Sequence, residues 1–154
     1  MDISNVLNVK NIKLNLMAKS KEEAVEELTD LLVQDGSISN KDDFLRDVWL
    51  REAQGSTGFE NHIAIPHGKS SGVVRTSLAI GRTQYEIPWE TMDGSDVRCI
   101  ILFAVCLVDQ NDAHIRLLSH VSGSLADEDI IAKLLQENDP QKVIELFNAE
   151  GANA

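Results

Sequence analysis

The hydrophobic positions of the chain switch between strand and helix periods from one end to the other. Apolar residues alternate with polar ones over residues 12–16, which is typical of a half-buried strand. Ser20 with Glu23 then forms a capping box, and the stripe behind it ends before Gly36. The members of this stripe are Ala24, Val25, Leu28, Leu31 and Leu32. The pattern predicts a strand followed by an amphipathic helix.

A second helix is predicted to begin after Asn40, which is a favourable N-cap residue. Asp42 and Asp43 fall in its first turn, where negative charge is stabilising. Its buried face comprises Phe44, Leu45, Val48 and Trp49. Arg51 falls in its last turn, where a cation is favourable by itself.

Short extended segments follow the two helices. We expect strands at residues 77–82, 85–89 and 97–108, with Asp93-Gly94 as a turn before the last of them. The last segment is apolar throughout, so we expect it to be central and covered on both faces.

Three further helices are predicted, beginning at Asp112, at Asp127 and at Asp139-Pro140. Helices on both sides of a set of strands indicate an α/β fold, with a mixed β-sheet sandwiched by helices in three α/β/α layers. We expect one domain over residues 1–148 and a frayed tail at 149–154.

Composition narrows the class of partner. The 154 residues and 17.0 kDa fit a single domain with a sizeable core. The formal charge of −11 disfavours nucleic acids and anionic membranes as partners and favours a protein with a basic face. An excess of acidic residues is also common for solubility alone, so a basic protein partner and solubility both stay open as explanations of the charge.

Neither a targeting segment nor a membrane span is predicted. Residues 1–10 lack a basic segment followed by an apolar one, and the longest apolar run, at 99–108, is far short of the ~20 residues that cross a bilayer. We therefore expect a cytoplasmic protein. Cys99 and Cys106 are seven positions apart, so on one strand they point to opposite faces, and we expect both to be reduced core residues.

The stretch from Gly55 to Lys69, GSTGFENHIAIPHGK, carries the candidate chemistry. Ile63 to Ile65 are too few and too apolar for a surface helix, and Pro66 favours extended geometry before it. His67 is therefore predicted at the rigid exit of a strand. Gly68 leaves room for a tetrahedral group to approach the backbone.

These residues resemble the fructose/mannitol-type (type 2) enzyme IIA domains of the bacterial phosphoenolpyruvate:sugar phosphotransferase system, including their nitrogen-regulatory branch. The resemblance rests on Arg51-Glu52, GSTG at 55–58, Asn61 and IAIPHGK at 63–69, and it covers nearly the whole chain. His62 departs from the family pattern, which has a small residue there. Asn61 stands where the mannitol branch has an acidic residue, so the chain leans toward the fructose or nitrogen-regulatory branch.

The resemblance implies a phosphocarrier with a phosphohistidine intermediate. It implies that His67 accepts a phosphoryl group from HPr on Nε2 and passes it to a IIB domain, with His114 beside it and Arg51 facing it. Ser56, Thr57, Asn61 and Gly68 are expected to line or bind the phosphate. No cofactor and no metal are expected, and the acceptor that holds Nδ1 of His67 is not identifiable from sequence.

We expect HPr and IIB to dock on one apolar patch formed by Phe59, His62 and Ile63. His120 is expected to be a solvated or packing residue.

Three other interpretations remain beside the phosphocarrier. His62, His67 and His114 with Glu60 would form a zinc site, although the two histidines on one strand should point to opposite faces. A regulatory module would use phosphorylation of the same His67 to switch binding to a non-sugar target. A catalytically silent relative is disfavoured because His67 is intact. The sugar, the branch and the oligomeric state are not readable from the sequence.

Overall fold

The computed structural model describes residues 3–109 and 112–153. Two α-helices follow one another after the N-terminal segment, α1 (Lys21–Gln34) and α2 (Lys41–Gln54). The Ser20 side chain accepts a hydrogen bond from the Glu23 amide, and the Asn40 side chain accepts one from the Asp43 amide, both at 3.1 Å. Both predicted helices and both caps are thus confirmed.

One five-stranded mixed sheet lies between the helices. Its strands are β1 (Ile12–Lys13), β2 (Ile63–Ala64), β3 (His67–Ser70), β4 (Ser77–Ile87) and β5 (Val97–Cys106). The path runs β1-β4-β5-β2, and β3 also pairs with β5. Among these described strands, β4 and β5 pair antiparallel and the other pairs are parallel. Strand β5 is central and almost fully buried, as predicted.

Two predicted strands prove to be one. Residues 77–82 and 85–89 were expected to be separate, but β4 continues through them to Ile87. A register irregularity between Arg82 and Ile87 absorbs the extra residues, so the ladder with β5 is bent rather than broken. The first strand is shorter than the alternation over residues 12–16 predicts, since only Ile12 and Lys13 pair in register with β4.

Strands β2 and β3 form one interrupted edge. Ala64 pairs with Ile100 and His67 pairs with Phe103, so the two strands keep the same offset along β5. The interruption lies at Ile65-Pro66, where proline cannot donate to a ladder. His67 therefore starts the second half of an edge strand and does not stand at a strand exit, which corrects the prediction.

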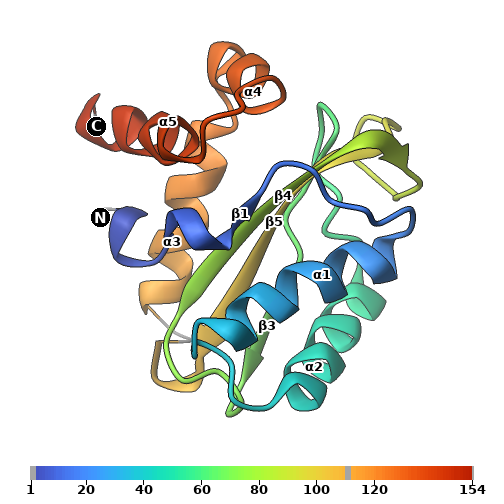
Figure 1. Cartoon of the computed structure of the whole chain (residues 1–154), viewed down its shortest axis with the longest axis vertical. Helices are drawn as coiled ribbons and strands as arrows, with labels where there is room; N and C mark the ends of the chain where they lie inside the picture. Colours follow the sequence, from blue (N-terminus) through green and yellow to red (C-terminus); the bar gives the residue numbers. More distant parts are fainter. Residues whose placement is uncertain (1–2, 110–111, 154) are drawn as a thin grey trace.

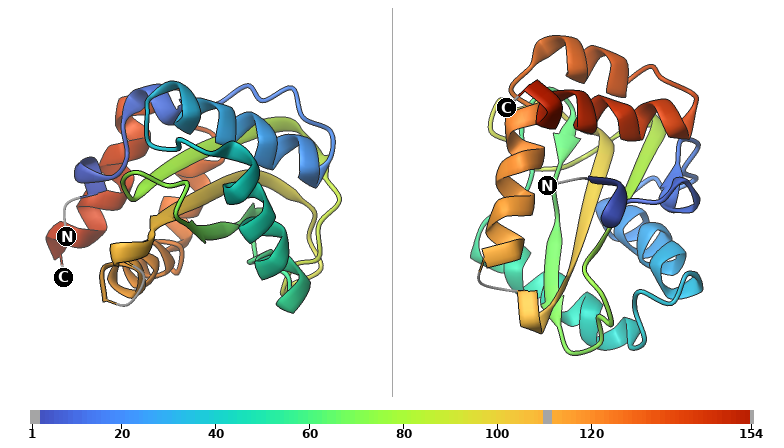
Figure 2. Two further views of the ribbon diagram at one scale, coloured as in Figure 1. Left: turned by 90° about the horizontal axis from the view of Figure 1, so that it is seen from below. Right: turned by 90° about the vertical axis from the view of Figure 1, so that its left-hand side faces the viewer.

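Helices cover both faces of the sheet, as expected for three layers. Figures 1 and 2 show α1 and α2 together on one side and α3 (Asp112–Ser124) with α5 (Pro140–Asn153) on the other. Helix α4 (Glu128–Leu134), capped by Asp127, joins the last two. Three short 3₁₀ helices complete the fold, at Ile3–Asn5, Val9–Asn11 and Leu107–Asp109.

The alternation of β5 divides the core into two. Ile101 and Phe103 pack with α3 and α5, whereas Ile100 and Leu102 pack with α1 and α2. Cys99 belongs to the first cluster and Cys106 borders the second, so the predicted opposite orientation is confirmed. Cys99 is fully buried, but Cys106 is only partly so.

A hydrogen bond connects the N-terminal segment with the last helix. The Ile3 amide donates to Asn148 Oδ1 at 3.3 Å, which links the first 3₁₀ helix to α5. The backbone of residues 149–153 continues α5, and residue 154 lies outside the described residues. The expected domain boundary at residue 148 stays a prediction. No helix in the described ranges is long and apolar enough to cross a bilayer.

Candidate functional site

His67 is a nearly buried polar residue at the sheet edge, with 7% of its surface exposed. Because it pairs with Phe103, its side chain lies on the face covered by α3. The two rings meet edge to face, with centroids 6.3 Å apart. Burial lowers the pKa of His67 below its ordinary value, so the imidazole is neutral near pH 7.

The ring orientation of His67 is set by a backbone carbonyl. Nδ1 lies 3.2 Å from the Ile65 oxygen. The carbonyls of His62 and Pro66 accept from β5 amides, so the intervening Ile65 carbonyl points away from the ladder. A carbonyl can only accept, hence Nδ1 carries the hydrogen and Nε2 keeps its lone pair. The sequence does not reveal this acceptor.

His114 lies in the first turn of α3 and approaches His67. The ring centroids are 5.6 Å apart and the planes are tilted by 48°. Its Nδ1 is buried and finds no hydrogen-bond partner among the described residues. Burial, with smaller effects from Lys69 and His67, lowers the pKa of His114 to about 4.

An open cleft of about 380 Å³ lies between α2 and β3 and reaches His67. Its walls are Asp47, Leu50, Arg51, Gln54, His67 and Lys69. After burial and the Ile65 hydrogen bond, the charges of Arg51 and Lys69 are the next largest influences on the His67 pKa, and both lower it. Arg51 Nη1 also donates to the Gly55 carbonyl at 2.8 Å, so it serves the helix end as well as the cleft.

Lys69 is a site residue to which sequence reasoning assigned no role. It lies two positions after His67 on one strand, a spacing that places both side chains on the same face. Its backbone amide donates to Asp47 Oδ2 at 2.5 Å, which ties β3 to α2. The strand period after His67 could have pointed to it.

The hydroxyls of Ser56 and Thr57 donate to residues on either side of the turn. Ser56 Oγ donates to the Glu90 carbonyl at 2.6 Å, and Thr57 Oγ1 donates to the Glu52 carboxylate. A Cβ on Gly58 would come within 1.9 Å of the Glu90 oxygen, so the turn packs closely there. Both hydroxyls therefore have structural partners, and their expected phosphate contacts remain predictions.

Asn61 and Gly68 have structural roles of their own. Asn61 has a φ of 56° and its amide donates to Asp93 Oδ2 at 3.0 Å, in the loop before β2. A Cβ on Gly68 would lie 2.9 Å from Val48 and 3.0 Å from Phe44, so its missing side chain lets α2 pack on β3. Roles of either residue toward phosphate stay predictions.

The apolar patch expected from Phe59, His62 and Ile63 does not form. Ile63 is completely buried, and Phe59 packs against the core on the α3 side. The reason is that Ile63 is a paired strand residue whose side chain faces inward. His62 is turned to the Asp96 carbonyl, 2.9 Å from its Nδ1.

The zinc interpretation also fails. No cluster of three or more His, Cys, Asp or Glu side chains suited to a metal is present in residues 3–109 and 112–153. His62 has φ of 68° and lies before β2, whereas His67 starts β3 beside His114. His120 is confirmed as a packing residue, since its Nε2 lies 3.0 Å from the Phe147 carbonyl.

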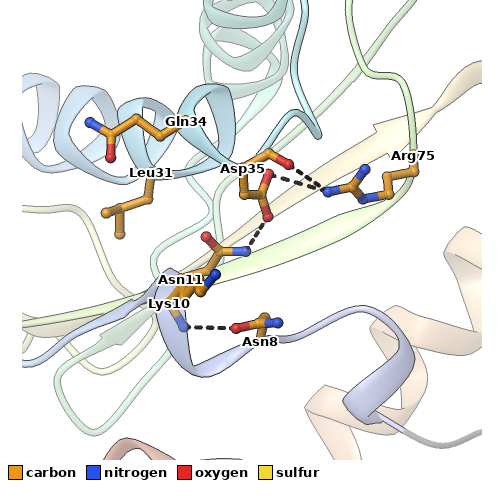
Figure 3. A pocket seen from close by; sticks show the side chains of 7 residues that line it. All are labelled: Asn8, Lys10, Asn11, Leu31, Gln34, Asp35 and Arg75. Carbon is orange, nitrogen blue, oxygen red and sulfur yellow. Dashed lines mark hydrogen bonds and ion pairs between the residues drawn. The ribbon is translucent and has the colours of Figure 1, made fainter.

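A larger cleft, of about 520 Å³, lies elsewhere, between the end of α1 and the N-terminal segment. Figure 3 shows Asp35 at its centre, bonded to Asn11 Nδ2 at 2.7 Å and to Arg75, whose Nη2 reaches the Asp35 carbonyl at 2.7 Å. The Asp35 carboxylate accepts from Asn11 and, at 2.8 Å, from the Ser37 amide, and no histidine, cysteine, serine or threonine lines this cleft among the described residues. The smaller cleft at His67 is therefore the better candidate for chemistry.

Comparison with known proteins agrees with the geometry. The family model described as "Phosphoenolpyruvate-dependent sugar phosphotransferase system, EIIA 2" matches residues 5–150. A fructose-specific EIIA component from Haloferax volcanii is 32% identical over 142 residues, which cover 92% of each chain.

Two further relatives differ in how much of their own length this chain matches. The fructose-specific EIIABC component of Bacillus subtilis is 30% identical over 96% of this chain, but the chain spans only 23% of that protein's length. The nitrogen regulatory protein IIA-Ntr from Neisseria meningitidis has a solved structure with a TM-score of 0.84 and 28% identity, covering 94% of this chain and 98% of that one.

Proposed function

This chain belongs to the EIIA 2 family of the phosphoenolpyruvate-dependent sugar phosphotransferase system, and we propose that it carries a phosphoryl group on Nε2 of His67. The observation that carries the assignment is the 3.2 Å contact between His67 Nδ1 and the Ile65 carbonyl, which leaves Nε2 as the free nucleophile. The chain acts as a phosphotransferase through a phosphohistidine intermediate.

Phosphoryl transfer between two histidines requires the protein mainly to position the reacting groups and to stabilise the charge on the phosphoryl oxygens. The Nε2 lone pair attacks phosphorus of the donor's phosphohistidine, the donor P–N bond breaks, and its electron pair returns to the donor imidazole. Transfer to the acceptor repeats this step with His67 as the leaving group. A neutral imidazole is the reactive form, and burial keeps His67 neutral.

Positive groups around His67 suit the transferred group. Arg51 and Lys69 share its cleft and can meet the equatorial oxygens as the loose transition state forms. His114 is neutral, and its buried Nδ1 finds no acceptor among the described residues, so its hydrogen is better placed on Nε2. In that form the ring can donate to a phosphoryl oxygen.

The partners proposed are HPr as donor and a IIB domain as acceptor. Both must reach the same imidazole, so both must dock on one surface. Exposed apolar side chains on the elements that carry the site, or on those next to them, offer such a surface: Leu50 on the cleft wall, Ile115 next to His114 in α3, and Leu107 and Val108 in the 3₁₀ helix that follows β5 and contacts α3. We assign the docking role to these four residues, which we call the apolar rim.

Incubation with phosphoenolpyruvate, enzyme I and HPr tests the assignment. The protein should gain one acid-labile, alkali-stable phosphoryl group, and His67→Ala should gain none. His120→Ala is the matched control and should be labelled as the parent is. If folded His67→Ala takes up label at the parental rate, the assignment is wrong.

The sugar served is proposed to be of the fructose or mannitol class, and the similarity to IIA-Ntr supports one alternative. In that alternative the same phosphohistidine controls binding to a regulatory target through its added charge. Transfer from the phosphorylated chain to fructose- or mannitol-class IIB domains separates the two. Turnover with a IIB domain supports the transport role, and its absence with every such domain favours the regulatory one.

A further inference from the structure

Glu52 is a buried carboxylate at the end of α2, next to Arg51 in sequence but with different partners. Its side chain is 6% exposed. Oε2 lies 2.7 Å from the Lys21 ammonium, and Oε1 accepts from the Thr57 amide at 3.2 Å and from the Thr57 hydroxyl. Lys21 in turn lies 5.0 Å from the centroid of the Trp89 ring. The charge is thus fully paired, as burial requires.

A continuous set of hydrogen bonds leads from Glu52 to His67. The Thr57 carbonyl accepts from the Ile65 amide at 3.0 Å. The Ile65 carbonyl then accepts from His67 Nδ1 at 3.2 Å. Glu52 therefore fixes Thr57, Thr57 bonds to the Ile65 amide, and the Ile65 carbonyl orients the reactive ring.

We propose that Glu52 is a positioning residue that fixes His67 in its Nδ1–H tautomer by way of Thr57 and Ile65. This inference rests on the proposed function for its biological meaning and on the hydrogen bonds alone for its geometry. Ile65 lies between two paired segments, and its own carbonyl points away from β5 to His67 Nδ1 instead of entering the ladder. The hydrogen bond from the Ile65 amide to the Thr57 carbonyl adds a constraint on that outer side.

A carboxylate suits this role better than an amide. It accepts from the amide and the hydroxyl of Thr57 while its second oxygen pairs with Lys21. An amide in the same place would present an NH₂ group to one of these donors and would lose a hydrogen bond. Glu52→Gln is therefore a small change in shape with a specific expected effect.

The experiment reads the His67 tautomer directly, by ¹⁵N NMR of the ring nitrogens in the folded full chain. The parent should show the Nδ1–H form alone. Glu52→Gln and Thr57→Val should both show a mixture with the Nε2–H form, and Thr57→Ser should restore the parent spectrum. Phosphoryl uptake should slow ~10-fold or more in the first two variants, because misplacing a reacting group is costly in rate.

Glu27→Gln is the matched control. Glu27 also pairs with a lysine, Lys13, at 3.1 Å and lies on a helix, but within the described part of the chain no hydrogen bond links it to the His67 segment. The His67 tautomer and the rate of phosphoryl uptake in this variant should equal those of the parent.

The outcomes separate this inference from the proposed function. A pure Nδ1–H tautomer and parental uptake in folded Glu52→Gln and Thr57→Val overturn the positioning role. If Glu52→Gln does not fold, Thr57→Val and its Thr57→Ser rescue decide the matter. If the parent takes up no phosphoryl group while the variants still change tautomer, the function falls and the positioning role stands.

Discussion

The imidazoles of His67 and His114 lie with their centroids 5.6 Å apart, although one starts strand β3 and the other lies in the first turn of α3. Neither ring is in contact with bulk water to any large extent, since they are 7% and 5% exposed. Two neutral imidazoles side by side, with Arg51 and Lys69 near, form a polar pocket that favours an anionic group.

Acid should destabilise the fold through His114. Its pKa is lowered to about 4 from 6.5, so between these values the unfolded chain binds the extra proton and stability falls as the pH falls. The effect amounts to ~3 kcal/mol over the whole window. Chemical denaturation of parent and His114→Gln from pH 7 to pH 4 checks this. The stability of the variant should fall less steeply, and parallel curves would contradict the shift.

His67 should titrate below its ordinary pKa. Burial is the main cause, and Arg51 and Lys69 add to it, while the Ile65 hydrogen bond opposes it. An NMR titration should place its midpoint under 6.5, with Lys69→Met moving the midpoint upward because a like charge is removed. A midpoint unaffected by Lys69→Met would separate that lysine from the site.

Arg51→Ala should slow phosphoryl uptake by ~10²-fold or more, because a donor to developing charge is lost from a preorganised site. Stability should change little, since the side chain lies in an open cleft and makes one hydrogen bond to a turn carbonyl. Arg46→Ala is the control, because Arg46 lies on the same helix and pairs with Asp43. Equal uptake rates in the two variants would reduce Arg51 to its helix-end role.

Gly68→Ala should destabilise the protein by ~1–3 kcal/mol, because its methyl group would press on Val48 and Phe44 in a packed layer. Gly123→Ala offers the comparison, since nothing lies within 4 Å of its Cβ position and alanine favours helix. Thermal unfolding of both variants measures the difference. A Gly68→Ala protein as stable as the parent would show that α2 can shift without cost.

The apolar rim should serve both partners. Leu50→Glu with Ile115→Glu should weaken transfer from HPr and to IIB together, because both side chains are more than half exposed, at 59% and 60%, beside the site. Met17→Glu, at 77% exposure in the loop before α1, should have no effect. Chemical-shift mapping of the two partners would refute the shared surface if they perturb separate faces.

Much of the fold follows from local sequence rules. The caps at Ser20, Asn40 and Asp127 are hydrogen bonds between near neighbours, so their residue types and spacing predict them. The unbroken apolar run of β5 likewise predicts a central strand, because both of its faces need apolar cover. The family motif pointed to His67, Arg51 and His114, and the structure brings these three into one neighbourhood.

Only the tertiary structure decided how the site is built. The carbonyl that orients His67, the burial of Ile63 and the use of Gly68 for helix packing depend on the register of β2 and β3 along β5. The contact of Thr57 with Glu52 joins residues only five positions apart, but the turn motif does not specify it. A sequence pattern reports which residues prefer to be buried or capped, whereas the partner of a polar atom depends on which distant segment the fold places beside it.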